Sequence, residues 1–376
     1  MKQSTRVAAI AGAVLAATAA ATATTAGAAV ASPAHHQPGG VFVQTNSAGG
    51  NRVVVYDKAL DQVGSYATGG VGGTLGGAVV DPLASQGGLV LDREHGLLYA
   101  VNAGSNTITV FGVHGDRLNR LQVIASGGTF PVSVAVHGDA VYVLNARNGG
   151  SVQGFKRIGS RLVLIPRWNR ALGLDAAATP EFTHTPGQVA FTPDGKHLLV
   201  TTKANTNEID VFAVSADGGV SAKPVRNVDA GAVPFAVSFD HFGRAVVAEA
   251  GPNAVATFDI HRDGRLTKVA EVATGSTATC WVVGADGKFY LANAGSATLT
   301  SVRAGRDGSL TKLTTTTAGA GTIDAAISPD GRTLYSENGG GTDGVTAFTV
   351  GHNGSLTSRG TATIPGGADA EGIAAF

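Results

Sequence analysis

Two ionisable side chains in this sequence follow short apolar runs, at places where a β-strand would end. Lys203 follows the run that begins at His197, and Glu249 directly follows the apolar run 245–248. A carboxylate can act as a general acid or base, and an ammonium group can stabilise a developing negative charge. Together with His184, these two residues are our candidate catalytic residues. The alternative for Glu249 is a structural ion pair, with Lys203 as its candidate partner.

Amide and carboxylate side chains at related places could bind a polar ligand. The candidate ligand-binding residues are Gln188, Glu181, Asn102, Asn145, Asn293, Asn338 and Asp324. Asparagine is also favoured before turns because it tolerates a left-handed backbone, so the four asparagines have a structural alternative. Three further residues, Cys280, Asp369 and Glu371, stand at comparable positions.

We expect a site without metal or cofactor. The sequence has no HExxH motif and a single cysteine, Cys280, so neither a cysteine-based zinc site nor an intramolecular disulfide is expected. We expect its thiol to be buried and inert rather than nucleophilic. The alternative is a Ca²⁺ ion held by oxygen ligands from Glu249, Asn102, Asn145 and Asn293.

These residues can form one site only if a repeated fold gathers them, and the chain does repeat. An apolar anchor recurs in steps of 43 to 57 residues, at Tyr99, Tyr142, Leu199, Val246, Tyr290 and Tyr335. Asp-Gly and Asn-Gly pairs, such as 194–195 and 353–354, separate the apolar runs and suit tight β-hairpins. A unit of about 45 residues with four short strands is typical of a β-propeller blade.

We therefore predict an all-β fold, a seven-bladed β-propeller with four antiparallel strands per blade over residues 41–376. The first blade, 41–68, has only three strands, so the C-terminal strand 372–376 is expected to complete it and close the ring. Two insertions, 69–86 and 166–186, lie between blades, and the glycine-rich first one is expected to be a flexible loop. The candidate residues would then surround the mouth of the central channel.

The N-terminus and the composition bear on location and partners. Lys2, Arg6, a long Ala-rich stretch and the small residues at 29–31 predict a secretory signal peptide over 1–31, followed by a linker over 32–40. We expect a secreted or cell-envelope monomer with no transmembrane segment in the mature chain. The sequence has 27 basic and 27 acidic residues, and this balance gives no electrostatic footprint for nucleic acid.

The sequence resembles the seven-bladed lactonase propellers, a family with bacterial 6-phosphogluconolactonase and fungal carboxymuconate-cyclising enzymes. The resemblance covers nearly all of 41–376 and rests on phrases such as GQVAFTPDGKHLLVTTKANTNEIDVFAV, LLYAVNAGSNTITVF and ISPDGRTLYSENGG. It implies lactone chemistry, but the family's Arg-His step falls on Gly187 and Gln188. Its Asn-Glu pair falls on Thr202 and Lys203. Glutamine does not titrate and lysine reverses the charge, so that chemistry does not carry over.

Three functions follow from these observations. The leading one is a secreted lactonase-type propeller that binds a small polar or anionic ligand at the channel mouth. The second is an active lactone hydrolase or cycloisomerase, similar to 6-phosphogluconolactonase, that uses Glu249, His184 and Lys203. The third is a non-catalytic extracellular interaction module, because a propeller fold does not determine function by itself.

Overall fold

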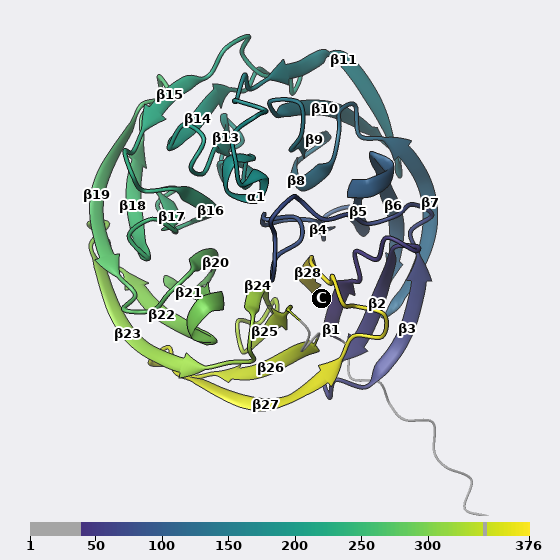
Figure 1. Ribbon diagram of the computed structural model, residues 1–376, viewed down its shortest axis with the longest axis vertical. Coiled ribbons are helices and arrows are strands. Elements are labelled where there is room, and N and C mark those ends of the chain that lie inside the picture. Colours follow the sequence, from purple (N-terminus) through teal and green to yellow (C-terminus); the bar gives the residue numbers. More distant parts are fainter. Residues whose placement is uncertain (1–38, 341–343) are drawn as a thin grey trace, which may run out of the picture. The chain divides into compact units, whose positions relative to one another are not determined.

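Seven β-sheets form the body of the protein. The computed structural model describes residues 39–340 and 344–376, so the signal peptide expected over 1–31 lies outside the described residues. Within these ranges, seven four-stranded antiparallel sheets stand in a ring around a common centre (Figure 1). The predicted seven-bladed propeller is therefore confirmed. None of the helices in the described part of the chain is long and apolar enough to cross a membrane.

The first three blades are built from the N-terminal strands. Blade one has β1 (Gly40–Gln44), β2 (Arg52–Asp57) and β3 (Gln62–Ala67), with β28 (Ile373–Ala375) as its innermost strand. Blade two has β4 (Leu89–Asp92), β5 (Leu97–Asn102), β6 (Thr107–His114) and β7 (Arg117–Ala125), with the 3₁₀ turn η1 (Ala103–Ser105). Blade three has β8 (Pro131–His137), β9 (Ala140–Asn145), β10 (Ser151–Ile158) and β11 (Arg161–Ala171), and the short helix α1 (Glu181–His184) follows it.

The remaining four blades follow the predicted spacing. Blade four has β12 (Val189–Phe191), β13 (His197–Thr201), β14 (Glu208–Ala213) and β15 (Val225–Val228). Blade five has β16 (Pro234–Phe239), β17 (Ala245–Glu249), β18 (Ala254–Ile260) and β19 (Leu266–Ala273). Blade six has β20 (Thr279–Ala285), β21 (Lys288–Asn293), β22 (Thr298–Ala304) and β23 (Leu310–Thr317), with η2 (Ala294–Ser296). Blade seven has β24 (Thr322–Ile327), β25 (Thr333–Asn338), β26 (Gly344–Val350) and β27 (Leu356–Thr363).

The core lies between neighbouring blades. Second strands such as β5 and β9 are buried along their whole length, because each face of the sheet packs on an adjacent blade. This burial explains their nearly continuous apolar sequences. The predicted anchors are all buried, with Tyr99, Tyr142 and Tyr335 fully inaccessible to solvent. Outermost strands such as β27 are mostly exposed and carry threonine and arginine instead.

The C-terminal strand closes the ring as predicted. β28 pairs antiparallel with β1, with Val41 opposite Ala375 and Val43 opposite Ile373. Beyond the strand, the Phe376 ring stacks on Phe42 with 4.3 Å between the ring centroids. The closure removes the exposed edge that β1 would otherwise present.

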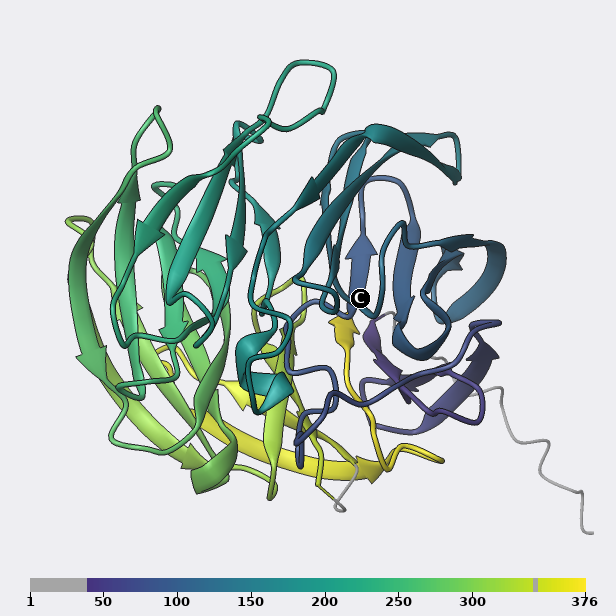
Figure 2. The same cartoon turned by 45° about the horizontal axis from the view of Figure 1, so that its top comes forward.

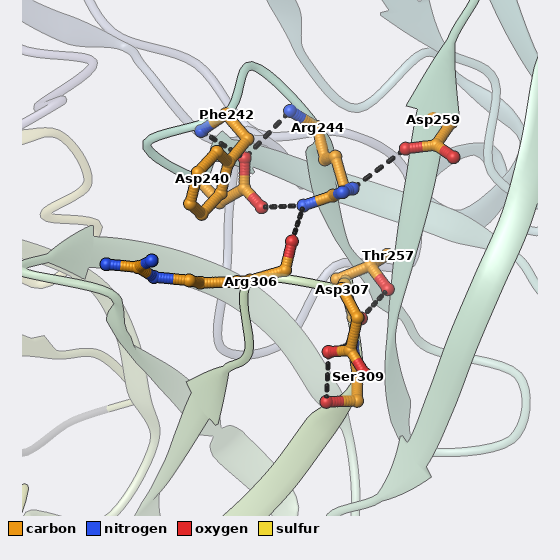
Figure 3. Close-up of polar contacts among 9 residues, drawn as sticks. Asp240, Phe242, Arg244, Thr257, Asp259, Arg306, Asp307 and Ser309 are labelled. Carbon is orange, nitrogen blue, oxygen red and sulfur yellow. Dashed lines mark hydrogen bonds and ion pairs between the residues drawn. The ribbon is translucent and has the colours of Figure 1, made fainter.

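A polar network clamps blade five to blade six at the turn between β16 and β17 (Figure 3). The Arg244 guanidinium donates to Asp259 at 2.8 Å and to the buried Asp240 at 3.3 Å. It also donates to the Arg306 carbonyl oxygen in blade six at 3.0 Å. A single side chain thus ties the β16–β17 turn to strand β18 of the same blade and to a turn of the next blade.

Both insertions differ from the sequence prediction. β11 continues to Ala171, so the second insertion starts six residues later than predicted. The first insertion, residues 69–86, is called the central segment here. The prediction of a flexible loop is wrong for its second half, because Leu83, Ala84 and Ser85 are buried in the middle of the ring.

Candidate functional site

The central segment fills the channel that the blades enclose. The Ser85 hydroxyl donates to the Val132 carbonyl oxygen of blade three at 2.8 Å. The Gln86 side-chain amide exchanges two hydrogen bonds of 3.0 Å with the backbone of Val282 in blade six. The Trp281 indole donates to the Ser85 carbonyl oxygen at 2.9 Å. Blades on opposite sides of the ring are therefore bridged through this segment.

Lys203 points into the same centre and is almost completely buried. Its ammonium group donates to the carbonyl oxygens of Ala84 and Phe182, both at 2.6 Å, and to the Thr185 hydroxyl at 3.1 Å. Burial lowers its pKa to about 8. Its backbone has a φ of +50°, a conformation that few residues other than glycine and asparagine adopt. All three ammonium protons are used within the protein, so this group does not face a ligand.

Three carboxyl groups are buried in the centre of the ring, and two of them, those of Asp81 and Glu371, act on Lys203. Asp81 lies on the central segment, Glu371 lies just before β28, and the two side chains share a hydrogen bond. Burial raises the pKa of Asp81 and, with the Asp81 charge, raises that of Glu371 well above its usual range. Asp324 accepts hydrogen bonds from backbone N–H groups that include Ala325 at 2.9 Å, and burial raises its pKa to about 8. Burial therefore favours the protonated form of these carboxyl groups.

A surface pocket of about 150 Å³ is lined by residues of α1 and of the turn after β9. Figure 2 shows the teal helix α1 beside the dark blue chain of the central segment, where the Phe182 N–H donates to the Gly76 carbonyl oxygen. One wall is the turn after β9, with Arg147 and Asn148, and the other is the second insertion, with Asp175, Glu181 and His184. The Arg147 guanidinium donates two hydrogen bonds, of 2.6 and 3.1 Å, to the Glu181 carboxylate. These bonds lower the pKa of Glu181.

His184 lines this pocket with one ring nitrogen committed. Its Nδ1 lies 2.9 Å from the Pro180 carbonyl oxygen, which can only accept a hydrogen bond. Thr183 Oγ1, which can donate or accept, also lies 2.9 Å from Nδ1. In the tautomer that donates to Pro180, the hydrogen is on Nδ1 and Nε2 carries the lone pair. The structure brings the candidates His184 and Glu181 into one pocket. The third residue, Lys203, is not in the lining but donates to the hydroxyl group of Thr185, which is.

Glu249 does not join this group. Its carboxylate lies 3.0 Å from the ammonium group of Lys268 on the outer strand β19 and contacts Asp229. Burial, followed by the nearby Asp229, raises its pKa to about 8. The ion-pair alternative thus matches the geometry, but with Lys268 in place of the expected partner Lys203.

The four asparagines lie at strand ends, and Asn102 also joins two blades by accepting a hydrogen bond of 3.0 Å from Asn51 of blade one. Each ends a second strand, and three bond across to neighbouring side chains: Asn102 to Thr107 and Thr109, Asn293 to Thr298 and Thr300, and Asn338 to Thr346. Asn145 is buried without a hydrogen-bond partner for its amide. Blade three has Pro131 opposite it, where blades six and seven place a threonine that donates to the asparagine.

Gln188 and its neighbour Gly187 have structural roles. The side-chain oxygen Oε1 of Gln188 accepts a hydrogen bond of 2.6 Å from the backbone N–H of Val237 in blade five. A Cβ at Gly187 would lie only 2.7 Å from the Phe235 carbonyl oxygen, so this position accepts no side chain without movement. The place where the lactonase family carries its Arg-His step is therefore closed to that pair here.

The geometry offers no evident metal centre. Among the described residues, no group of three or more His, Cys, Asp or Glu side chains is arranged to hold an ion. The four residues of the calcium alternative are spread over blades two, three, five and six. Asp369 is exposed near the C-terminus, and Cys280 is half-buried with its pKa raised to about 12 by burial.

Sequence reasoning missed Arg147, Asp81 and Asp175. Arg147 lies two residues after the strand-end Asn145, so the pattern that selected Asn145 could have included it. Asp81 precedes Pro82 and Leu83 in a glycine-rich stretch. These two apolar residues could have indicated that this part of the loop is buried. Only the structure shows that Asp81 meets Glu371, because 290 residues separate them.

Comparison with known proteins places the fold. No family model matches the sequence, and no curated protein is detectably related to it. A putative 6-phosphogluconolactonase from Bacteroides fragilis superposes with a TM-score of 0.69 at 17% identity, over 92% of this chain and 100% of that one. The periplasmic gluconolactonase of Pseudomonas aeruginosa gives 0.70 at 16% identity, over 87% and 97%. A Lactobacillus plantarum protein gives 0.68 at 20% identity, over 90% and 99%. The fold is therefore that of the 6-phosphogluconolactonase-like seven-bladed propellers.

Proposed function

We propose that this chain is a secreted propeller that binds a small polar ligand, of the size of one sugar ring, in the pocket between α1 and the turn after β9. The observation that carries the proposal is the pocket itself, with the Arg147–Glu181 pair and His184 in its walls. A cavity of about 150 Å³ is known to admit a single six-membered ring.

The charges of the pocket favour a polyhydroxylated ligand without a strong net charge. Glu181 already neutralises the Arg147 guanidinium through two hydrogen bonds, and Asp175 adds a carboxylate. A carboxylate accepts hydrogen bonds from hydroxyl groups, and the imidazole of His184 offers a further acceptor. A sugar or a sugar lactone fits this set of donors and acceptors better than an anion does.

The residues at the lactonase family's catalytic positions, Gln188 and Lys203, favour binding over lactone hydrolysis because both are bonded within the protein. Gln188 is bonded to the backbone of blade five, and Lys203 is bonded to the central segment. Lys203 has no free N–H to offer a substrate, and the side-chain oxygen of Gln188 already accepts a hydrogen bond from blade five. The central segment also occupies the channel at the level of these residues.

One observation favours a second candidate function, hydrolysis of a lactone within the same pocket. The Nε2 lone pair of His184 could accept a proton from water that attacks the lactone carbonyl carbon. Replacing His184 with glutamine would abolish such turnover and leave binding in place.

The test is a thermal-shift and calorimetric titration with glucono-1,5-lactone, gluconate, glucose and glucuronate. We expect at least one neutral ring to raise the Tm, because a ligand at 100 times its Kd stabilises the folded state by about 2.7 kcal/mol. Arg147→Ala should weaken binding about tenfold, through loss of the pocket wall. Arg157→Ala, at the Asp139 ion pair in the same blade, is the matched control. The proposal fails if no compound binds or if both variants bind equally.

A further inference from the structure

Two ionisable side chains, Glu371 and Lys203, form hydrogen bonds with the central segment in the channel. The Leu83 backbone N–H donates to Glu371 Oε2 at 2.5 Å, and the Ser85 hydroxyl lies 3.3 Å from Glu371 Oε1. The ammonium group of Lys203 donates to the Ala84 carbonyl oxygen at 2.6 Å. Three consecutive residues of the segment are thus fastened by one carboxyl group and one ammonium group.

The carboxyl group of Glu371 has a second carboxyl group against it. Asp81 Oδ1 accepts the Ala84 N–H at 2.6 Å, and the Asp81 side chain shares a hydrogen bond with Glu371. Two carboxylates are both acceptors, so a hydrogen bond between them requires one proton. Asp81 belongs to the segment and Glu371 to the closing strand region, so this proton joins the segment to the ring.

The surrounding charges cannot balance a second anion. The titratable groups that face the pair are Lys203 after β13, Asp324 on β24 and Cys280 on β20. Glu337 on β25 adds a further carboxyl group, which accepts the N–H of Gly372 beside Glu371 at 3.0 Å. Lys203 is the cation that faces the pair. With the pair singly protonated, Lys203 balances the one negative charge that the pair carries.

We propose that the central segment is a proton-held plug: the proton shared by Asp81 and Glu371 keeps it in the channel, and loss of that proton releases it. In this step hydroxide removes the proton to give water, and the carboxylic acid and carboxylate become two carboxylates. Their repulsion in a buried site, with one ammonium group nearby, then favours the open segment. Release is therefore expected as the pH rises, and acid favours the plugged state.

Release would also loosen the ligand pocket, and this part of the inference rests on the proposed function. The Gly76 N–H of the segment donates to Glu181 Oε2 at 2.6 Å, and the Phe182 N–H donates to the Gly76 carbonyl oxygen at 3.3 Å. Lys203 donates to the Phe182 carbonyl oxygen and to Thr185. The α1 wall of the pocket is thus fastened to the plug, so ligand affinity should fall when the plug leaves.

Trp281 provides a direct readout, since its indole donates to the Ser85 carbonyl oxygen and is buried against the segment. Acrylamide quenching of tryptophan fluorescence should rise about twofold between pH 6 and pH 9.5 in the wild type, because local opening exposes the indole. Glu371→Gln should make this rise clearly smaller, because its amide donates to Asp81 at every pH and only the titration of Lys203 remains to loosen the segment. Asp81→Asn should do the same from the other side, and it carries the test if the first variant does not fold.

Hydrogen exchange separates the plug from the pocket without any ligand. Exchange corrected for intrinsic pH dependence should rise in residues 75–87 and 180–186 together in the wild type, and clearly less in both segments of the variants. The plug is refuted if wild type and variants change alike, which would place the titration elsewhere, or if none changes. Its coupling to the pocket is refuted if 180–186 stays protected while 75–87 exchanges. Failure of the sugar panel would overturn the proposed function alone, because neither readout uses a ligand.

Discussion

Replacing Glu249 with glutamine tests whether folding raises the pKa of this buried carboxyl group and so favours its protonated form. The side chain is fully buried, lies 3.0 Å from the Lys268 ammonium group and contacts Asp229. Burial and Asp229 raise its pKa from 4.5 to about 8. Glutamine has the shape of the protonated acid: its amide nitrogen can donate to Asp229, and its carbonyl oxygen can accept from Lys268. The variant should therefore fold and keep both contacts.

The size of the effect follows from the pKa of Glu249 in the two states. A carboxyl group whose pKa is raised by folding favours the folded state most at low pH. That contribution is lost as the pH rises from the unfolded pKa towards the folded one, at about 1.4 kcal/mol per pH unit. With Glu249 titrating at about 8 in the folded protein, the window runs from 4.5 to about 8. Between pH 5 and pH 7.5 the wild type should lose about 3 kcal/mol through this residue, and the glutamine variant should lose none.

Urea unfolding at pH 5 and pH 7.5 measures the difference. The free energy of unfolding of Glu249→Gln, relative to the wild type, should increase by about 3 kcal/mol between the two pH values. Asp210 and Asp324, with pKa values raised by burial to about 7 and about 8, titrate in both proteins, so their contributions cancel. Glu271→Gln is the control, because this half-exposed carboxylate binds the same lysine. Parallel pH profiles, or a variant less stable than the wild type at both pH values, would refute the reasoning.

Three further predictions follow from the fold. Arg244→Ala should lower the free energy of unfolding by about 2–3 kcal/mol, because it leaves the buried Asp240 without its cation; a urea midpoint unchanged from wild type would contradict this. Gly187→Arg should lower the Tm without creating lactonase activity, since its Cβ would meet the Phe235 carbonyl oxygen at 2.7 Å; an unchanged Tm would show that the backbone gives way. EDTA followed by Ca²⁺ should leave the Tm unchanged, since the described residues hold no cluster suited to a metal ion, and a shift reversed by Ca²⁺ would establish the calcium alternative.

The repeat in the sequence was sufficient to predict the architecture. Hairpins are local, and the turn pairs and buried anchors such as Tyr99 and Tyr335 recur because every blade packs in the same way. The closing strand was predictable for the same reason, since blade one lacked one strand and the C-terminus had one to spare. Local regularity thus determined the blades, their number and the closure.

The candidate site was harder to predict because it depends on segments outside the repeat. Lys203 was selected as a strand-end residue, but its partners Ala84 and Phe182 belong to the two insertions. Glu249 was selected by the same rule, yet its partner Lys268 is on an outer strand, which a rule about the ends of second strands does not reach. The repeat predicts the position of a residue in its blade. The contacts of its side chain also depend on segments outside that pattern.

The closure of blade one has a consequence for how the chain is made. The innermost strand of the first blade is synthesised after all the other described strands, and Glu371, which fastens the plug, precedes it by only two residues. Neither the ring nor its centre can be completed before β28 has left the ribosome. Until then, the inner edge of β1 is unpaired and the central segment has no anchor at Leu83, so the ring depends on β28 for its last cooperative step.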